Sequence, residues 1–87
     1  MNYSPIFGWL NLEKDDDLKK FGFVISKKIS KRAVDRNKIK RRLTESIRKN
    51  LDAFKKGTRI VFLIKREILN KNIKEIEEEI RKLIIKN

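Results

Sequence analysis

The sequence contains no cysteine and no histidine among its 87 residues, and it has one proline and three glycines. Without cysteine or histidine, the chain has no thiolate nucleophile, no imidazole acid or base, no disulfide framework and none of the common zinc sites. The lack of disulfides fits an intracellular protein. The groups that remain for acid or base chemistry are carboxylates in unremarkable settings, so the chain lacks the usual catalytic residues.

Long apolar runs are lacking as well. No run approaches the roughly 20 residues of a membrane-spanning helix, and the first residues, Met1–Pro5, carry no basic segment typical of a signal peptide. Even so, the hydrophobic content of 39% is too high for a disordered basic tail, and the run Ile60–Ile64 is apolar enough to form core. We therefore expect residues 1–87 to form a single small cytoplasmic domain with a modest core.

Basic residues are abundant and clustered. The chain has 24 Lys and Arg against 12 Asp and Glu, a net charge of +12. Residues 27–49 hold eleven basic and two acidic side chains, so this segment accounts for nine of the twelve net charges. Like charges at this density repel one another, and they usually persist because a polyanion neutralises them. A lysine-rich surface for solubility is the alternative, but solubility does not require clustering.

Three segments have the composition of strands. Residues 5–12 and 20–26 are rich in aromatic and branched side chains, and we expect them to form an antiparallel hairpin. The loop between them contains Asp15–Asp17, which lack the spacing of a calcium loop and are interpreted as a solvated turn. Residues Thr58–Lys65 are expected to form an apolar strand that is buried on both faces.

Two segments have helical periodicity. Ile39, Leu43, Ile47, Leu51 and Phe54 recur every three or four residues, which predicts a long helix with Ser30 as a candidate N-cap and Gly57 as the stop. Asn70 or Asn72 is expected to cap a last helix. Its apolar face comprises Ile73, Ile76, Ile80, Leu83 and Ile84, and its predicted ion pairs are Glu77–Arg81 and Glu78–Lys82. The predicted fold class is α+β with the order β-β-α-β-α, a small sheet packed against the long basic helix and a C-terminal helix.

The long helix presents basic side chains outside its apolar stripe. One flank carries Asn37, Arg41, Thr44 and Arg48; the far side carries Lys38, Arg42 and Lys49; Lys40 borders the stripe and Arg36 falls within its sector. The arginine fork binds phosphate, and the Asn37 amide suits a base edge or a ribose 2′-OH. Membrane binding is disfavoured because the outer face lacks bulky apolar anchors. A strand, not a short helix, precedes this helix, which favours RNA over DNA.

Residues 20–45 resemble a known family. Residues 20–28 read K-F-G-F-V-I-S-K-K, and residues 31–41 read K-R-A-V-D-R-N-K-I-K-R. This sequence is similar to the protein subunit of bacterial ribonuclease P. Its most distinctive stretch, A-x-x-R-N-x-x-K-R, is formed here by Ala33, Arg36, Asn37, Lys40 and Arg41, with Glu45 at a common acidic position downstream. The close match covers about a third of the chain, and the element order extends it more loosely.

The resemblance implies a ribonucleoprotein endonuclease that removes the 5′ leader from precursor tRNA. A large RNA performs the hydrolysis with bound Mg²⁺, and the protein contributes no catalytic residue and no metal site. Arg36, Asn37, Lys40 and Arg41 would contact the catalytic RNA, supported by Lys27, Lys28, Lys31, Arg32, Arg42 and Arg48. The family also joins parallel strands through the basic helix by a left-handed crossover, against the general rule.

The sequence departs from the family pattern near its start. Family members usually begin with a basic helix that forms one wall of a leader cleft over the sheet, and this chain begins almost at the first strand. Phe7 and Trp9 share one side of that strand and are expected to stack on unpaired leader bases; the alternative is that both belong to the core. Phe21 and Phe23 are expected in the core. A non-catalytic RNA-binding module, such as a small ribosomal or RNA-chaperone protein, is the alternative function.

Overall fold

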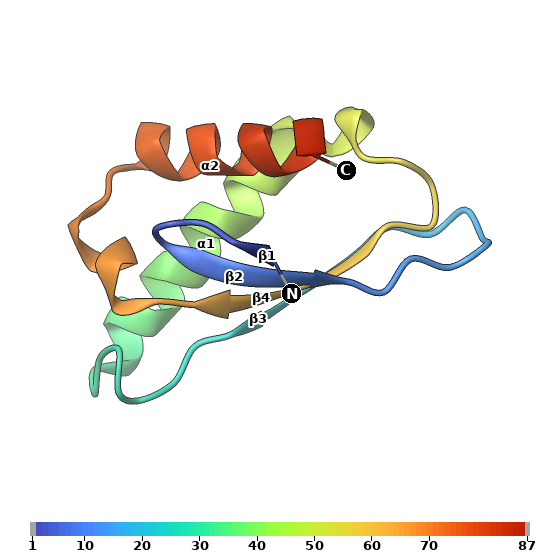
Figure 1. Cartoon of the computed structure of the whole chain (residues 1–87). Helices are drawn as coiled ribbons and strands as arrows, with labels where there is room; N and C mark the ends of the chain where they lie inside the picture. Colours follow the sequence, from blue (N-terminus) through green and yellow to red (C-terminus); the bar gives the residue numbers. More distant parts are fainter. Residues whose placement is uncertain (1, 87) are drawn as a thin grey trace.

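The computed structural model describes residues 2–86 and contains a four-stranded sheet and two helices (Figure 1). The elements are β1 (Asn2–Tyr3), β2 (Phe7–Asn11), β3 (Lys20–Val24), α1 (Ala33–Lys49), η1 (Leu51–Ala53), β4 (Arg59–Ile64), η2 (Arg66–Asn70) and α2 (Ile73–Lys86), where η marks a 3₁₀ helix. Both α-helices cover the same face of the sheet (Figure 1). The predicted α+β class and element order are confirmed, with the short β1 strand added.

The strand order is β1-β2-β4-β3, with β4 antiparallel to β2 and parallel to β3. The predicted hairpin between residues 5–12 and 20–26 is therefore wrong, because β4 lies between the two strands. β4 is the most apolar strand. At the centre of the sheet its backbone pairs with β2 on one edge and β3 on the other, and the apolar side chains are shielded from water by neighbouring strands. β3 and β4 are parallel neighbours connected through α1; the left-handed sense of this crossover stays a prediction.

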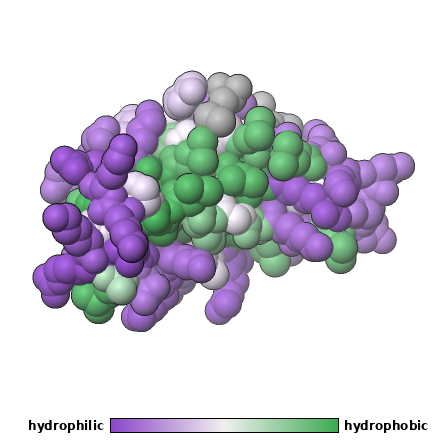
Figure 2. Space-filling model, turned by 90° about the horizontal axis from the view of Figure 1, so that it is seen from below, coloured by the Kyte–Doolittle hydropathy of each residue, from purple (hydrophilic) through white to green (hydrophobic). Residues whose placement is uncertain are grey.

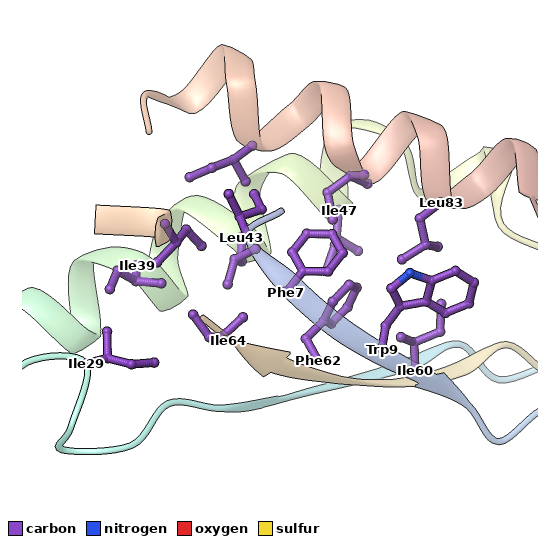
Figure 3. Packing of buried hydrophobic residues seen from close by; sticks show 14 of the residues in the cluster. Phe7, Trp9, Ile29, Ile39, Leu43, Ile47, Ile60, Phe62, Ile64 and Leu83 are labelled. Carbon is purple, nitrogen blue, oxygen red and sulfur yellow. The ribbon is translucent and has the colours of Figure 1, made fainter. Parts of the chain in front are cut away.

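β4 is buried on one face, not on both as predicted. Ile60, Phe62 and Ile64 are buried beneath the helices, while the residues between them are half-buried. The Phe62 ring meets Phe7 edge-on, with 5.0 Å between ring centroids (Figure 3). It also stacks on Phe23, with 5.5 Å between centroids. Phe21 and Phe23 pack against the core as predicted. The strand has one buried face because both helices lie on the same side of the sheet.

α1 ends at Lys49, earlier than the predicted stop at Gly57. The Asn50 side chain donates to the Ser46 carbonyl oxygen at 2.8 Å, and the chain then turns into η1. Ile39, Leu43 and Ile47 are buried as the stripe predicts. Phe54 is also buried, but it reaches the core from the segment after η1, and Leu51 is exposed. The apolar spacing therefore extends beyond the end of the helix, and Phe54 meets the core from a different element.

The two helices start differently, because α2 has a side-chain cap and the N-cap residue of α1 makes no side-chain capping hydrogen bond. Arg32, not Ser30, occupies the N-cap position of α1, although the Ser30 hydroxyl accepts from the Arg32 N–H at 3.2 Å. At α2, Asn72 Oδ1 accepts from the Glu75 N–H at 2.9 Å, and Glu75 Oε1 accepts from the Asn72 N–H at 3.3 Å. This reciprocal pair is a capping box and confirms Asn72, rather than Asn70, as the cap.

The faces of α2 differ in chemistry. Ile76, Ile80 and Leu83 are buried and contribute to the core. On the polar side, Arg81 pairs with Glu77 at 2.9 Å as predicted. Lys82 pairs with Glu79 at 3.2 Å, so the predicted Glu78–Lys82 pair is wrong. Glu79 and Lys82 both border the small hollow between α2 and the turn after β1.

Candidate nucleic-acid interface

The exposed side of α1 carries a shallow cationic groove. Its lining residues come from successive turns of the helix: Asn37, Lys40, Arg41, Thr44, Glu45 and Arg48. All of them are exposed. Because Ile39, Leu43 and Ile47 are fixed in the core on the opposite side, the helix presents this groove to solvent in one orientation. Three cations and an amide in a row suit the phosphates and edges of an RNA.

The loop between β3 and α1 extends this basic surface beyond the start of the helix. Lys27, Lys28, Lys31 and Arg32 are exposed on it. Ile29 lies between them with 9% of its surface exposed and joins the hydrophobic core. The structure thus brings the loop cations next to the first turn of α1, where Arg32 approaches Asp35 to 3.8 Å.

Arg36 and Arg42 differ from the other predicted contacts because both are half-buried. Arg36 Nη1 donates to the Ser30 carbonyl oxygen at 2.7 Å. Arg42 Nη1 donates to the Lys71 carbonyl oxygen at 3.4 Å. Each guanidinium therefore has part of its donor set directed at the protein backbone. The half-buried position of Arg36 agrees with the prediction that it falls within the apolar sector of the helix.

Phe7 and Trp9 lie in the core, so their predicted role in leader binding is wrong. Phe7 is fully buried and Trp9 is 3% exposed, beneath Leu83 of α2 (Figure 3). Neither ring has a free face on which a base could stack. Alternation along a strand shows which residues share a face, but it does not show which face the helices cover.

The opposite face of the sheet is apolar and partly exposed. Its residues are identified by their cross-strand partners: Gly8 opposes Leu63, Leu10 opposes Val61, and Val24 opposes Leu63. Leu10 is 39% exposed and Val24 is 52% exposed. Figure 2 shows this area from below as an apolar patch with hydrophilic residues on both sides. We call these residues, together with Tyr3, the open sheet face.

Tyr3 and Lys65 lie together at one margin of the open sheet face. Tyr3 is 66% exposed and stands beside Gly8 on the neighbouring strand. The Lys65 Nζ lies 5.1 Å from the centre of the Tyr3 ring and donates to the Ser4 carbonyl oxygen at 2.8 Å. The margin thus offers an aromatic ring and a cation. The sequence carried a signal for this face, because apolar residues occupy both alternating sets of positions in β4.

The acidic loop before β3 forms a solvated turn, as predicted. Asp16 Oδ1 accepts from the Leu18 N–H at 3.0 Å, and its other oxygen pairs with Arg59. Across residues 2–86, no three acidic side chains are close enough together to hold a metal ion. In the same part of the chain, no helix is long and apolar enough to cross a membrane. The contacts of Asp16 thus stabilise the turn in this loop.

The contacts of Asp16 give stability a dependence on pH. The hydrogen bond from the Leu18 N–H, with Arg59 nearby, holds the pKa of Asp16 below its ordinary value of 3.8. A carboxyl group with a lowered pKa in the folded state stabilises the protein above its unfolded-state pKa, and this contribution disappears as the pH falls through the folded-state pKa. We expect Asp16→Asn to lower the free energy of unfolding at pH 7 and to match the unsubstituted protein at strongly acidic pH. Urea unfolding at several pH values measures this, and a difference that does not depend on pH would contradict it.

A cationic helix and loop on a small mixed sheet define the class, an α+β protein with a basic surface suited to RNA. Residues 4–87 match the family Ribonuclease P, and the chain belongs to this family. It is similar to the ribonuclease P protein component of Alkaliphilus oremlandii, with 37% identity over 75 residues that cover 86% of this chain and 65% of the relative. It is also similar to the protein component from Clostridium botulinum, with 38% identity over 71 residues, 80% of this chain and 63% of the relative.

Solved structures show the same fold. The RNase P protein from Thermotoga maritima superimposes with a TM-score of 0.87 at 24% identity, over 98% of this chain and 80% of that one. A mutant RNase P protein from Staphylococcus aureus gives a TM-score of 0.81 at 21% identity, over 92% of this chain and 67% of that one. The curated relatives are longer: the chain spans 65%, 57% and 49% of three of them.

Proposed function

We propose that this chain is an RNA-binding protein subunit of ribonuclease P that promotes removal of the 5′ leader from precursor tRNA. The observation behind the proposal is the groove on α1, where Asn37, Lys40, Arg41 and Arg48 are exposed in a row on a helix fixed against the core. The first three of these residues belong to the stretch that resembles the family most. Family membership of residues 4–87 supports the same role.

The groove on α1 and the loop between β3 and α1 are proposed to bind the catalytic RNA. Phosphate oxygens would accept from the Lys40, Arg41 and Arg48 cations, and the Asn37 amide would bond to a base edge or a ribose 2′-OH. The loop cations Lys27, Lys28, Lys31 and Arg32 would bind further phosphates beyond the helix start. With about six phosphate contacts, log affinity should fall with log salt at a slope of about −4 to −5.

The leader of the precursor is proposed to cross the open sheet face. Unpaired bases bury their faces against apolar and aromatic side chains, and the exposed Leu10, Val24 and Tyr3 offer such surfaces. Lys65 stands at the margin, where it can bind a backbone phosphate. This assignment replaces Phe7 and Trp9, which are in the core.

The reaction also needs Mg²⁺, which the resemblance assigns to the RNA. Among the described residues, no group of three carboxylates could hold a metal ion, and Asp16 and Glu75 serve in an ion pair and a helix cap. We propose that the protein binds and orients the two RNA molecules and that the hydrolytic step belongs to the catalytic RNA with its metal ions.

Cleavage of precursor tRNA by ribonuclease P RNA at low Mg²⁺, with and without this protein, tests the proposal. The RNA should come from the same source as the protein. We expect cleavage to be several-fold faster with the folded protein because neutralised phosphates reduce the need for Mg²⁺. Absence of stimulation by a folded sample would contradict the proposal.

The same assay distinguishes the proposed function from the alternative, a non-catalytic RNA-binding module. A small ribosomal or RNA-chaperone protein would bind structured RNA with a similar dependence on salt, yet it would not raise the rate of cleavage at the leader junction. Mature tRNA, which has no leader, serves as the control for leader binding. Adding the protein to the catalytic RNA should raise its affinity for precursor tRNA more than its affinity for mature tRNA.

A further inference from the structure

Two arginines from different elements hold the loop that precedes α1. We call residues 26–32 the basic loop, because four of its side chains are cationic. Arg36 of α1 donates from Nη1 to the Ser30 carbonyl oxygen at 2.7 Å. Arg66 of η2 donates from Nη2 to the Lys28 carbonyl oxygen, also at 2.7 Å. Two carbonyl oxygens of the loop backbone therefore accept hydrogen bonds from guanidinium groups, one on α1 and one on η2. Hydrogen bonds from charged donors are among the stronger ones in proteins.

Other contacts fix the middle of the basic loop. Ile29 is 9% exposed and packs in the core, and its N–H donates to the Ser26 carbonyl oxygen at 3.1 Å. The Ser30 hydroxyl accepts from the Arg32 N–H at 3.2 Å and donates to the Asp35 carboxylate at 3.0 Å. The backbone is thus tied down at several points while the four cationic side chains of the loop remain exposed.

This arrangement opposes the electrostatics of the free protein. Lys27, Lys28, Lys31 and Arg32 repel one another, and the guanidiniums of Arg36 and Arg66 add positive charge beside them. Repulsion alone would favour a loop that moves away from both arginines. Because the loop is already ordered in the free protein, binding loses less conformational entropy than it would with a mobile loop.

The geometry points to Arg36 and Arg66 as positioning residues that hold the basic loop ready to bind the backbone phosphates of RNA. The inference rests on the proposed function, because it takes RNA as the ligand of the loop. It changes the role of Arg36, which the family motif would place directly on the RNA. It also adds Arg66, which lies in η2, outside the motif, and which no sequence pattern indicated.

Hydrogen exchange of the free protein, followed by NMR, tests the clamp without any RNA. The variants are Arg66→Gln and Arg36→Gln, with Lys31→Gln as the matched control because it removes an exposed cation from the same loop. We expect the amides of Ile29 and Arg32 to exchange at least about tenfold faster in both arginine variants, because local opening of the loop becomes easier. Amides of β4 and the middle of α1 should be unchanged, and Lys31→Gln should leave the loop amides unchanged.

Binding to the catalytic RNA gives the second readout. Arg66→Gln should weaken affinity about three- to tenfold at fixed salt, since the loop must now be ordered on binding, and should leave the salt slope unchanged. Lys31→Gln should reduce the magnitude of the slope by about 0.7 to 0.9, as expected for one lost phosphate contact. A purely structural role would lower the free energy of unfolding without changing the affinity of the folded protein.

The two readouts distinguish the possible failures. Unchanged exchange at Ile29 and Arg32 in both arginine variants would overturn the clamp, and a slope reduced by about one would then identify the arginines as direct phosphate contacts. Faster exchange with unchanged RNA affinity would also overturn it, because positioning would have no effect on binding. If the unsubstituted protein did not bind the RNA, the proposed function would fail, and with it the RNA as the ligand of this loop.

Discussion

Gly57→Ala is expected to destabilise the protein by roughly 3 kcal/mol or more, because two separate penalties act at this position. Gly57 has a φ of 83°, a backbone conformation that side chains with a Cβ rarely adopt. In addition, a Cβ at this position would lie 1.9 Å from the Lys14 carbonyl oxygen. The turn cannot move away freely, since the Gly57 N–H donates to the Leu18 carbonyl oxygen at 2.9 Å and its own carbonyl oxygen accepts from the Lys14 N–H at 2.9 Å.

Thermal and urea unfolding followed by circular dichroism measure the effect. A loss of this size corresponds to a fall in Tm of about 12 to 24 °C for a domain of this length. Gly22→Ala is the matched control, because no atom lies within 4 Å of the Cβ that it would introduce. We expect that control to change stability by less than about 0.5 kcal/mol. Equal stability of the two variants would show that the turn at Gly57 has a different conformation.

Arg41→Ala combined with Arg48→Ala is expected to weaken binding to the catalytic RNA by about a hundredfold or more, if each lost charged contact costs about 1.5 kcal/mol. Both side chains line the groove on α1, and both are exposed. Two fewer phosphate contacts should also make the dependence of log affinity on log salt shallower by about 1.4 to 1.8. Stability should change little, because neither residue contributes to the core.

A variant of equal charge tests whether position matters. Lys74→Ala combined with Arg81→Ala removes two exposed cations from α2. This control should reduce affinity only through the weak, long-range effect of net charge, which salt screens. If both double variants weakened binding equally at about 0.15 M salt, where charges interact over about 8 Å, the groove on α1 would not be the binding surface. Binding is measured by fluorescence titration at several salt concentrations.

Periodicity in the sequence predicted the elements well where burial enforces it. The stripe of Ile39, Leu43 and Ile47 predicted the core side of α1, and the complementary pattern predicted its exposed basic side. The cap of α2 is local, and the sequence narrowed it to Asn70 or Asn72; the capping box that Asn72 forms with Glu75 decides between them. For the same reason, the exposed positions of Asn37, Lys40, Arg41 and Arg48 were predictable before any fold was known.

Contacts between distant segments were not predictable in this way. β4 lies between β2 and β3 in the sheet. No local pattern in β2 or β3 indicates that each pairs with β4 and not with the other. The face that the helices cover was equally undetermined, which led to the wrong role for Phe7 and Trp9. Arg66 contacts Lys28 across 38 positions, so the clamp on the basic loop depends on the tertiary fold.

The place of β4 at the centre of the sheet sets the order of events during synthesis. β3 pairs with β4, and β2 has the two-residue strand β1 on one edge and β4 on the other, so the sheet cannot join β2 to β3 until residues 59–64 have been made. Pairings between strands far apart in sequence form slowly, because a long loop must close before they are rewarded. The basic segment at residues 27–49 therefore leaves the ribosome ahead of the strand that completes its support. The sheet therefore forms late in synthesis, and a nascent chain that stopped before residue 59 would expose its cationic segment without the central strand of the sheet.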